Sequence, residues 1–218
     1  MVFGRYWAHK AAKEKAARLP RPVLRSFETD GLDETEELFW RTCELSGSIL
    51  DIGAGDNRVK RKFLERGYSG SYLTYDLSRE FDHDFYALRD ITGSFDAILL
   101  LEVIEHMTLE EFYALMERLD GLLAKRGIFI VSTPNPACIS SMWAGDMTHV
   151  QQYPLNDLLA FFMVRGFSCE AYRVLYSRKR VTLADQFRQF LRKVLVTQVL
   201  GADYADGIIV IARRAVLK

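Results

Sequence analysis

Residues 48–57 read SILDIGAGDN, an apolar run that ends in an acidic residue and two glycines in a G-x-G pattern. The run from Ser48 to Ile52 predicts a short strand, and the residues after Gly55 predict the start of a helix. Glycines at a strand-to-helix turn let the backbone approach a bound ligand without interference from a Cβ atom. We therefore expect a ligand-binding turn at the carboxyl end of a strand in an α/β fold.

The chain around this turn alternates between strand and helix patterns. Phe95–Leu101 is almost continuously apolar, as expected for a strand that is buried on both faces of a parallel sheet. Such alternation predicts a doubly wound, mostly parallel seven-stranded sheet with helices on both faces. The expected strands and short strand-like segments are 48–52, 71–75, 85–88, 95–101, 128–132, 167–175 and 207–212, and the expected helices include 59–66, 109–123 and 155–165.

Composition limits the class of protein. The 218 residues suit one α/β domain, with residues 1–45 as an N-terminal cap or helical appendage and 46–218 as the main domain. Three cysteines without a C-x-x-C spacing indicate a reducing compartment, and the early charges and the absence of a long apolar run favour a cytoplasmic protein. The 29 basic residues balance the 29 acidic ones, which weighs against binding nucleic acid through its phosphates.

A second acidic residue narrows the class of ligand that the chain is expected to bind. Asp76 ends the expected strand 71–75 and follows Gly55 by 21 residues, where a carboxylate can accept both hydroxyls of a ribose. The dinucleotide fingerprint G-x-G-x-x-G would need a third glycine at the position of Arg58. The pattern therefore favours an adenosyl ligand over NAD.

On these residues the chain resembles the class I methyltransferases that use S-adenosylmethionine (SAM), of the type 11 or type 23 kind. The resemblance spans about residues 49–167 and includes the turn before Gly127, although Lys125-Arg126 and Asp56-Asn57 depart from the family pattern. It implies that SAM lies along the carboxyl edge of the sheet, with the methionine part at the glycine turn, the ribose on the acid and the adenine further along. The implied cofactor residues are Asp51, Gly53, Gly55, Asp76, Asp90, Ile91 and Glu102.

A further group of polar residues follows the strand 95–101. Glu102, Glu105 and His106 form an E-x-x-E-H pattern, and His149 comes later, in the loop after the strand 128–132. Carboxylates and imidazoles predict a site for a divalent cation such as Mg²⁺, with these four residues as ligands. The pattern is similar to that of ubiquinone-pathway O-methyltransferases and of enzymes that 2′-O-methylate small RNAs. Without a metal, His149 is either a catalytic general base or an ordinary loop histidine that caps a helix.

Near the carboxyl terminus, residues 183–200 predict an amphipathic helix within a helical insertion at about 177–203. Arg178, Lys179 and Arg180 precede it. We interpret its apolar stripe as core against the sheet, and a lid, a peripheral contact with a membrane surface and a homodimer face are alternatives. No segment predicts a transmembrane span.

Together these patterns predict a SAM-dependent O-methyltransferase that acts on a small molecule or a sugar unit of a glycan. Methyl transfer from a sulfonium needs positioning more than a nucleophilic side chain, so the absence of a catalytic Ser or Cys pattern is consistent with it. The alternatives are an RNA 2′-O-methyltransferase and a SAM-binding module without catalysis. The neutral net charge disfavours RNA, while basic clusters near both ends of the chain favour it.

Overall fold

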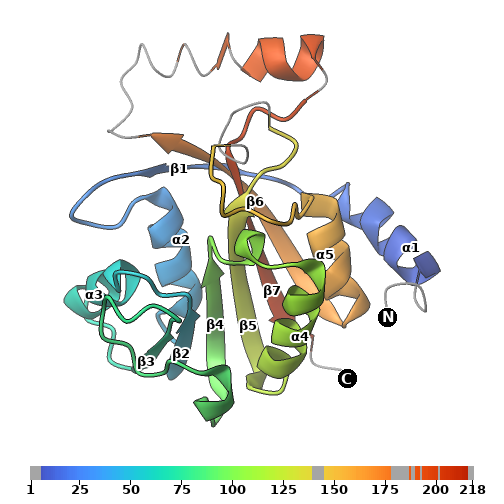
Figure 1. Ribbon diagram of the computed structural model, residues 1–218. Helices are drawn as coiled ribbons and strands as arrows, with labels where there is room; N and C mark the ends of the chain where they lie inside the picture. Colours follow the sequence, from blue (N-terminus) through green and yellow to red (C-terminus); the bar gives the residue numbers. More distant parts are fainter. Residues whose placement is uncertain are drawn as a thin grey trace.

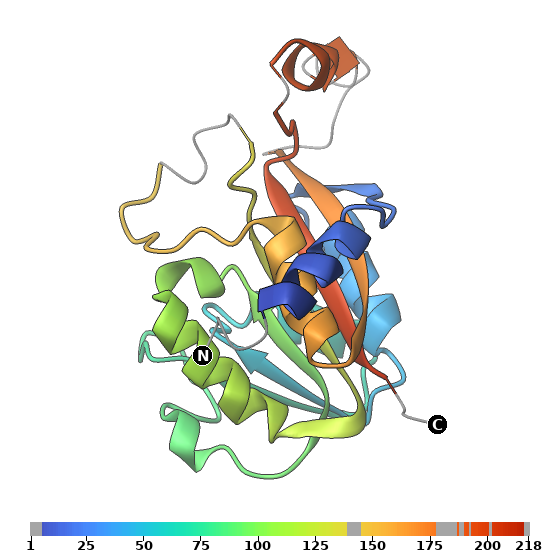
Figure 2. The ribbon, with the colours of Figure 1, turned by 90° about the vertical axis from the view of Figure 1, so that its right-hand side faces the viewer.

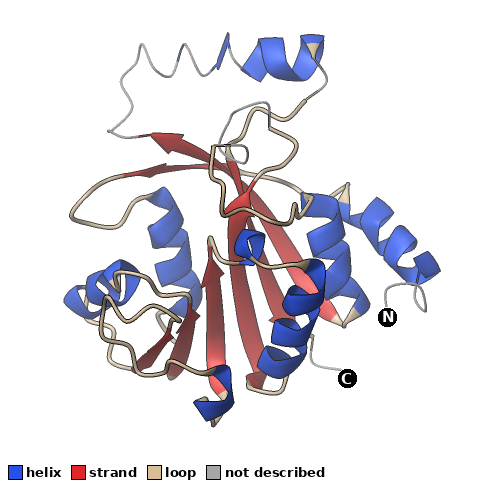
Figure 3. Cartoon of the chain, in the orientation of Figure 1, coloured by secondary structure: helices blue, strands red, loops and turns tan. Residues whose placement is uncertain are grey.

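The computed structural model describes residues 6–138, 145–177, 187, 190–191, 193–200 and 202–215. A central sheet carries helices on both faces (Figures 1, 2 and 3). In chain order the elements are α1 (Tyr6–Ala16), β1 (Val23–Phe27), α2 (Glu34–Cys43), β2 (Ser48–Ile52), α3 (Arg58–Glu65), β3 (Ser71–Tyr75), η2 (Leu88–Asp90), β4 (Phe95–Leu101), η3 (Ile104–His106), α4 (Leu109–Asp120), β5 (Leu123–Pro134), α5 (Leu155–Val164), β6 (Phe167–Ser177), η4 (Leu195–Val199) and β7 (Gly207–Arg214).

The seven strands form one sheet in the order β1-β6-β7-β5-β4-β2-β3. Every neighbouring pair is parallel except those of β7, which runs antiparallel to both β5 and β6. The predicted doubly wound, mostly parallel sheet is confirmed. Because six strands run the same way, their carboxyl ends meet at one edge, which lies at the top of Figure 1.

One strand of this sheet comes from the amino-terminal part of the chain. β1 pairs in parallel with β6, with Val23 beside Arg173 and Phe27 beside Ser177. It lies in the stretch 1–45, which the sequence pattern assigned to a cap or appendage, and this edge strand was not expected. The short segment expected at 85–88 contributes only an isolated bridge between Phe85 and Tyr75. The boundary between residues 45 and 46 as a domain division stays a prediction.

Each face of the sheet has its own apolar core. On one face α2 and α3 pack through Phe39 and Phe63, and on the other α4 and α5 pack through Phe112 and Phe162. The side chains of β4 alternate between the two cores and are buried in both, which explains its continuous apolar run. The β4 residues are Ala97 and Leu99 on the α2 and α3 face, and Ile98 and Leu100 on the α4 and α5 face.

The described residues between 187 and 200 do not join either core. They project beyond the carboxyl edge of the sheet (Figures 1 and 2), and Phe187 and Phe190 are 63% and 59% exposed. The interpretation of this stripe as core was therefore wrong. Residues 178–186, 188–189, 192 and 201, which belong to the expected insertion at 177–203, lie outside the described residues. Within the described parts of the chain, no helix has both the length and the apolar character to cross a membrane.

Candidate active site

The glycine turn after β2 depends on residues that adopt left-handed backbone conformations. Gly53, Gly55 and Asn57 have φ values of 70°, 52° and 59°. A Cβ atom on Gly53 would lie 2.5 Å from a methyl carbon of Val103, so no larger residue fits there. Asn57, at the position where the family pattern has glycine, is one of the few residue types that tolerate this conformation. The turn therefore keeps its shape despite the departure at Asp56-Asn57.

Asp51 lies in β2 just before this turn and is 3% exposed. Its carboxylate accepts a hydrogen bond of 2.8 Å from the hydroxyl of Tyr72 on the neighbouring strand β3. Burial raises the pKa of Asp51 to about 7, and the bond from Tyr72 opposes part of that effect. Asp51 therefore sits beneath the turn as a buried acid with one fixed partner.

Asp76 follows β3 and reaches the glycine turn. One carboxylate oxygen accepts a hydrogen bond of 2.9 Å from the backbone N–H of Gly55, and the other accepts one of 2.8 Å from Ser78. Further along the edge, Asp90 ends η2 and is exposed, whereas the side chain of Ile91 is fully buried in the core. The structure thus joins the two predicted halves of the motif, the glycines and the acid.

A cleft of about 1220 Å³ opens beside this turn, at the carboxyl ends of β2, β4, β5 and β6. Its volume is somewhat above the range of about 300 to 1,000 Å³ that small ligands and cofactors usually occupy. Of the predicted cofactor residues, Asp51, Gly53, Gly55 and Glu102 line it. Asp76, Asp90 and Ile91 do not belong to its lining.

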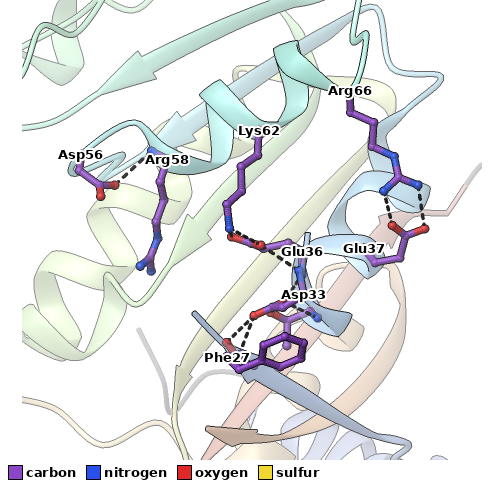
Figure 4. A network of polar contacts seen from close by, with 10 residues as sticks. Phe27, Asp33, Glu36, Glu37, Asp56, Arg58, Lys62 and Arg66 are labelled. Atoms are coloured by element: carbon purple, nitrogen blue, oxygen red, sulfur yellow. Dashed lines mark hydrogen bonds and ion pairs between the residues drawn. The ribbon is translucent and has the colours of Figure 1, made fainter. Parts of the chain in front are cut away.

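The segment between β1 and α2 forms the opposite wall of the cleft (Figure 4). Asp33 caps α2, bonds the backbone N–H of Phe27 at 3.1 Å and pairs with Glu36 in a capping box. Lys62 of α3 contacts the Glu36 carboxylate at 2.7 Å, and both side chains are largely buried. These contacts attach β1 and α2 to α3, the helix that follows the glycine turn. Only the D-x-x-E spacing of the cap was visible in the sequence.

Glu102 lies at the end of β4 and closes one end of the cleft. It has a φ of 55°, a costly conformation for glutamate that persists only where surrounding contacts fix it. Here they do: its carboxylate accepts hydrogen bonds from Ser132 at 2.7 Å and from Tyr176 at 3.1 Å. Burial raises the pKa of Glu102, against the effect of these two donors. Sequence reasoning missed both donors, and no motif marks either of them.

Behind Glu102, the E-x-x-E-H pattern and the later loop meet. Glu105, His106 and His149 each offer a ligand atom, and these atoms all lie within 4.8 Å of one another. The loop is attached to η3 because the carbonyl of Glu105 accepts the backbone N–H of Val150 at 2.8 Å, and Thr148 bonds the His106 ring at 2.9 Å. Three of the four predicted metal ligands therefore come together, and Glu102 lies outside this group.

The surroundings shift the pKa values of the acids in and beside this cluster. Glu105 is 1% exposed, and burial, with Glu102 nearby, raises its pKa to about 8. One of its oxygens accepts a hydrogen bond of 3.0 Å from Thr133, while the other, Oε1, is buried and has no hydrogen-bond partner in the part of the chain that the structure describes. The His149 ring lies 3.9 Å from a carboxylate oxygen of Asp146, and hydrogen bonds from Thr148 lower the pKa of that acid. The site therefore combines a buried acid with two imidazoles.

These features define a class of protein. A strand-to-helix glycine turn in contact with an acid at the end of the next strand is the arrangement of an α/β protein that binds a nucleoside-containing ligand. The chain belongs to the methyltransferase domain family, whose model matches residues 18–172, and is therefore an enzyme that transfers methyl groups. No curated protein sequence matches the chain.

Solved structures share the fold at low sequence identity. A SAM-dependent methyltransferase from Archaeoglobus fulgidus is 14% identical with a TM-score of 0.61, and the match covers 83% of this chain and 93% of that one. The Pnkp1/Rnl/Hen1 RNA repair complex matches at 19% identity and a TM-score of 0.53, over 83% of this chain and 41% of that one. Magnesium protoporphyrin IX methyltransferase from Synechocystis PCC 6803, with bound S-adenosylhomocysteine, is 14% identical with a TM-score of 0.50. The match covers 97% of this chain and 85% of that one.

The buried acid beneath the turn makes stability depend on pH. Because the folded-state pKa of Asp51 is about 7 and the usual value is near 4, the folded protein retains a proton that the unfolded chain loses. Its contribution to stability is present at low pH and declines as pH rises from about 4 to about 7. Asp51→Asn keeps an acceptor for Tyr72 but cannot titrate. We expect the unfolding free energy of this variant, relative to wild type, to rise by roughly 1 to 4 kcal/mol over that range.

Urea denaturation at several pH values measures this difference. Asp82→Asn, the same change at an exposed aspartate, is the matched control and should follow the wild type. Parallel curves for Asp51→Asn and the wild type between pH 4 and pH 7 would contradict the assignment of a raised pKa to Asp51.

Proposed function

We propose that the enzyme methylates a hydroxyl group on a small molecule or a sugar unit. The observation that carries this proposal is the cluster of Glu105, His106 and His149, which lies near Glu102, a residue of the cleft wall. The three residues of the cluster are not themselves part of that wall. The charges of both histidines act on the pKa of Glu102, which supports their proximity to the cleft. A hydroxyl acceptor must lose its proton during transfer, and this cluster supplies groups that can take it or weaken its bond.

SAM is proposed to lie along the carboxyl edge of the sheet. The methionine part would rest on the backbone of Gly53 and Gly55, and Asp76 would accept the ribose hydroxyls. Asp76 already bonds Gly55, and its remaining lone pairs leave room for further donors. Asp90 and Ile91 would flank the adenine, with Ile91 contributing backbone because its side chain is buried. The reactive methyl group would then point toward Glu102.

Chemistry at this site is proposed to consist mainly of positioning. Bound SAM would supply a methyl group on a sulfonium, which an acceptor oxygen could take by in-line displacement, with a neutral thioether as the leaving group. His149 would accept the hydroxyl proton as general base, and the resulting imidazolium would face the carboxylate of Asp146, 3.9 Å away. Glu102 is held by Ser132 and Tyr176, so it is suited to orient the acceptor.

The same cluster fits a divalent cation. Two ligands on one ion lie at most about 4.2 Å apart, twice a typical metal–ligand distance. Ligand atoms that all lie within 4.8 Å of one another therefore need at most small side-chain adjustments to bind one ion. The unpartnered Oε1 of Glu105 is the atom that a cation would satisfy. Glu105, His106 and His149 would hold the ion, and two imidazoles favour a transition metal such as Mn²⁺ over Mg²⁺. A bound cation would supply Lewis-acid activation of the acceptor hydroxyl.

The proposal is tested by offering the purified enzyme methyl-labelled SAM with pools of hydroxyl compounds, sugars and short RNAs. We expect label in a small-molecule or sugar pool, measured with and without chelator and with added Mg²⁺ or Mn²⁺. An RNA 2′-hydroxyl is the alternative acceptor, because it needs the same deprotonation. Label found only in RNA would replace the small-molecule assignment, and label found only on nitrogen, carbon or sulfur would contradict a hydroxyl acceptor.

Binding of the cofactor is expected to depend on Asp76. Asp76→Ala should weaken the binding of S-adenosylhomocysteine by about 2 to 5 kcal/mol in calorimetry, since it removes a charged acceptor of the ribose hydroxyls. The matched control is Asp82→Ala, an exposed aspartate of the same loop, which should bind like the wild type. NAD should not bind either protein. Equal affinity of Asp76→Ala and wild type would remove Asp76 from the cofactor site.

Turnover is expected to depend on His149 far more than cofactor binding does. His149→Ala should lower the methylation rate by roughly 10² to 10⁴, with the affinity for S-adenosylhomocysteine nearly unchanged. If a cation takes part, Glu105→Ala and His106→Ala should show the same defect and chelator should abolish activity. A His149→Ala enzyme with normal turnover that chelator does not affect would exclude both roles for this histidine.

A further inference from the structure

The helical segment between β6 and β7 exposes a row of large apolar side chains. Leu195 and Val199 are 57% and 70% exposed, in addition to Phe187 and Phe190. Together with Leu191 they recur in the sequence at intervals of three and four residues, the spacing of one side of a helix, and all five described positions are helical, with Leu195–Val199 as a π-helix. A row of this size exposed to water is unfavourable, because each side chain forgoes about 1.5 to 3 kcal/mol of burial. Such a surface therefore indicates a partner.

The charge of the segment indicates which kind of partner. By sequence, residues 178–200 contain six basic residues and one acidic residue, a net charge of +5, while the remainder of this neutral chain carries −5. The basic residues are Arg178, Lys179, Arg180, Arg188, Arg192 and Lys193, and the acidic residue is Asp185. Apolar side chains combined with a local excess of Lys and Arg are typical of helices that lie in the interface of an anionic membrane.

The position of the segment agrees with this partner. It is inserted between the carboxyl end of β6 and the start of the antiparallel strand β7, so it stands at the edge of the sheet where the cleft opens (Figures 1 and 2). The loop after β5 adds two further apolar side chains at this end, because Met147 is 99% and Val150 60% exposed. Two separate projections thus present apolar residues at the same end of the molecule.

We infer that the exposed apolar side chains of Phe187, Phe190, Leu191, Leu195 and Val199 form a docking surface for anionic membranes. A second copy of the chain fits the surface less well, since the stretch 178–200 carries a net charge of +5 by sequence and two copies of it would repel each other. Nucleic acid also fits less well, because Leu191, Leu195 and Val199 gain nothing from phosphates and cannot stack on bases as aromatic side chains do. A lipid leaflet provides both an apolar layer and negative head groups.

Docking in this way turns the carboxyl edge of the sheet toward the leaflet. An acceptor held in the membrane would then reach the cleft without crossing water. This consequence rests on the proposed function, because it assumes that the cleft holds SAM. The docking itself does not depend on it.

The inference is tested by sedimentation of the full chain with vesicles of phosphatidylcholine, either alone or with one-third phosphatidylglycerol. We expect the wild type to bind the anionic vesicles, to bind the neutral ones much less, and to lose affinity as salt rises. The double variant Phe190→Glu/Leu195→Glu should bind the anionic vesicles at least about tenfold more weakly. Leu45→Glu is the matched control, because Leu45 is 96% exposed and precedes β2 at the opposite edge of the sheet.

The possible outcomes distinguish a loss of membrane docking from a loss of folding. Binding of S-adenosylhomocysteine by the double variant shows that it is folded, and the salt dependence of the wild type needs no variant. Failure of the wild type to bind anionic vesicles, or equal binding by the double variant, overturns the inference. The inference is also overturned if the wild type does not bind vesicles but forms a concentration-dependent dimer, or binds RNA, and the double variant does not. Vesicle binding without methyl transfer would leave the docking surface standing and contradict the proposed function alone.

Discussion

The close approach of Gly53 to Val103 is the contact on which the site depends. A Cβ atom at residue 53 would lie 2.5 Å from the Val103 side chain, so glycine is required there for reasons of space as well as backbone conformation. Val103 directly follows Glu102 and precedes η3. The contact therefore fixes the glycine turn after β2 against the chain that carries Glu102 and Glu105. A larger residue at position 53 would separate the two halves of the site.

Asp51 and Glu105 are buried at this edge of the sheet and Glu102 is partly buried, and the three acids differ in their hydrogen bonds. Asp51 accepts a bond from Tyr72, Glu102 accepts bonds from Ser132 and Tyr176, and one oxygen of Glu105 has no hydrogen-bond partner among the described residues. Burial raises the pKa of all three. Such groups cost stability unless they are paired, and they cluster where chemistry requires perturbed acids. Among these three acids, Glu105 is distinguished by an oxygen that is fully buried and accepts no hydrogen bond from the described residues.

The sheet and the helices that cover it fix the position of the carboxyl edge, while two segments between the strands carry the exposed and the chemically distinctive side chains. The loop after β5 brings His149 to η3, and the segment between β6 and β7 carries the exposed apolar row. The ion pair of Lys62 in α3 with Glu36 in α2 forms part of the wall of the cleft. Loops on a rigid sheet can vary in this way without loss of the core.

The sequence by itself determined the central strands and the order of the motifs. Strands 48–52, 71–75 and 95–101 were predicted with the bounds that the structure has. For 95–101 the reason is that a strand buried on both faces of a parallel sheet is apolar almost throughout. The glycine turn with Asp76, and Glu105 with His106, were also read correctly as neighbours, since each depends on positions at the ends of adjacent strands or within one turn.

Only the tertiary structure decided the rest. The edge strand β1 is only partly buried and has no apolar run, so its pattern did not predict a strand. Tyr176 bonds Glu102 across 74 residues of sequence, and that bond separates Glu102 from the predicted metal ligands. An apolar stripe has the same helical period whether it faces a core or solvent, so 187–200 was assigned to the core although it is exposed. Local patterns record the period of an element, whereas its partners depend on contacts between residues far apart in the chain.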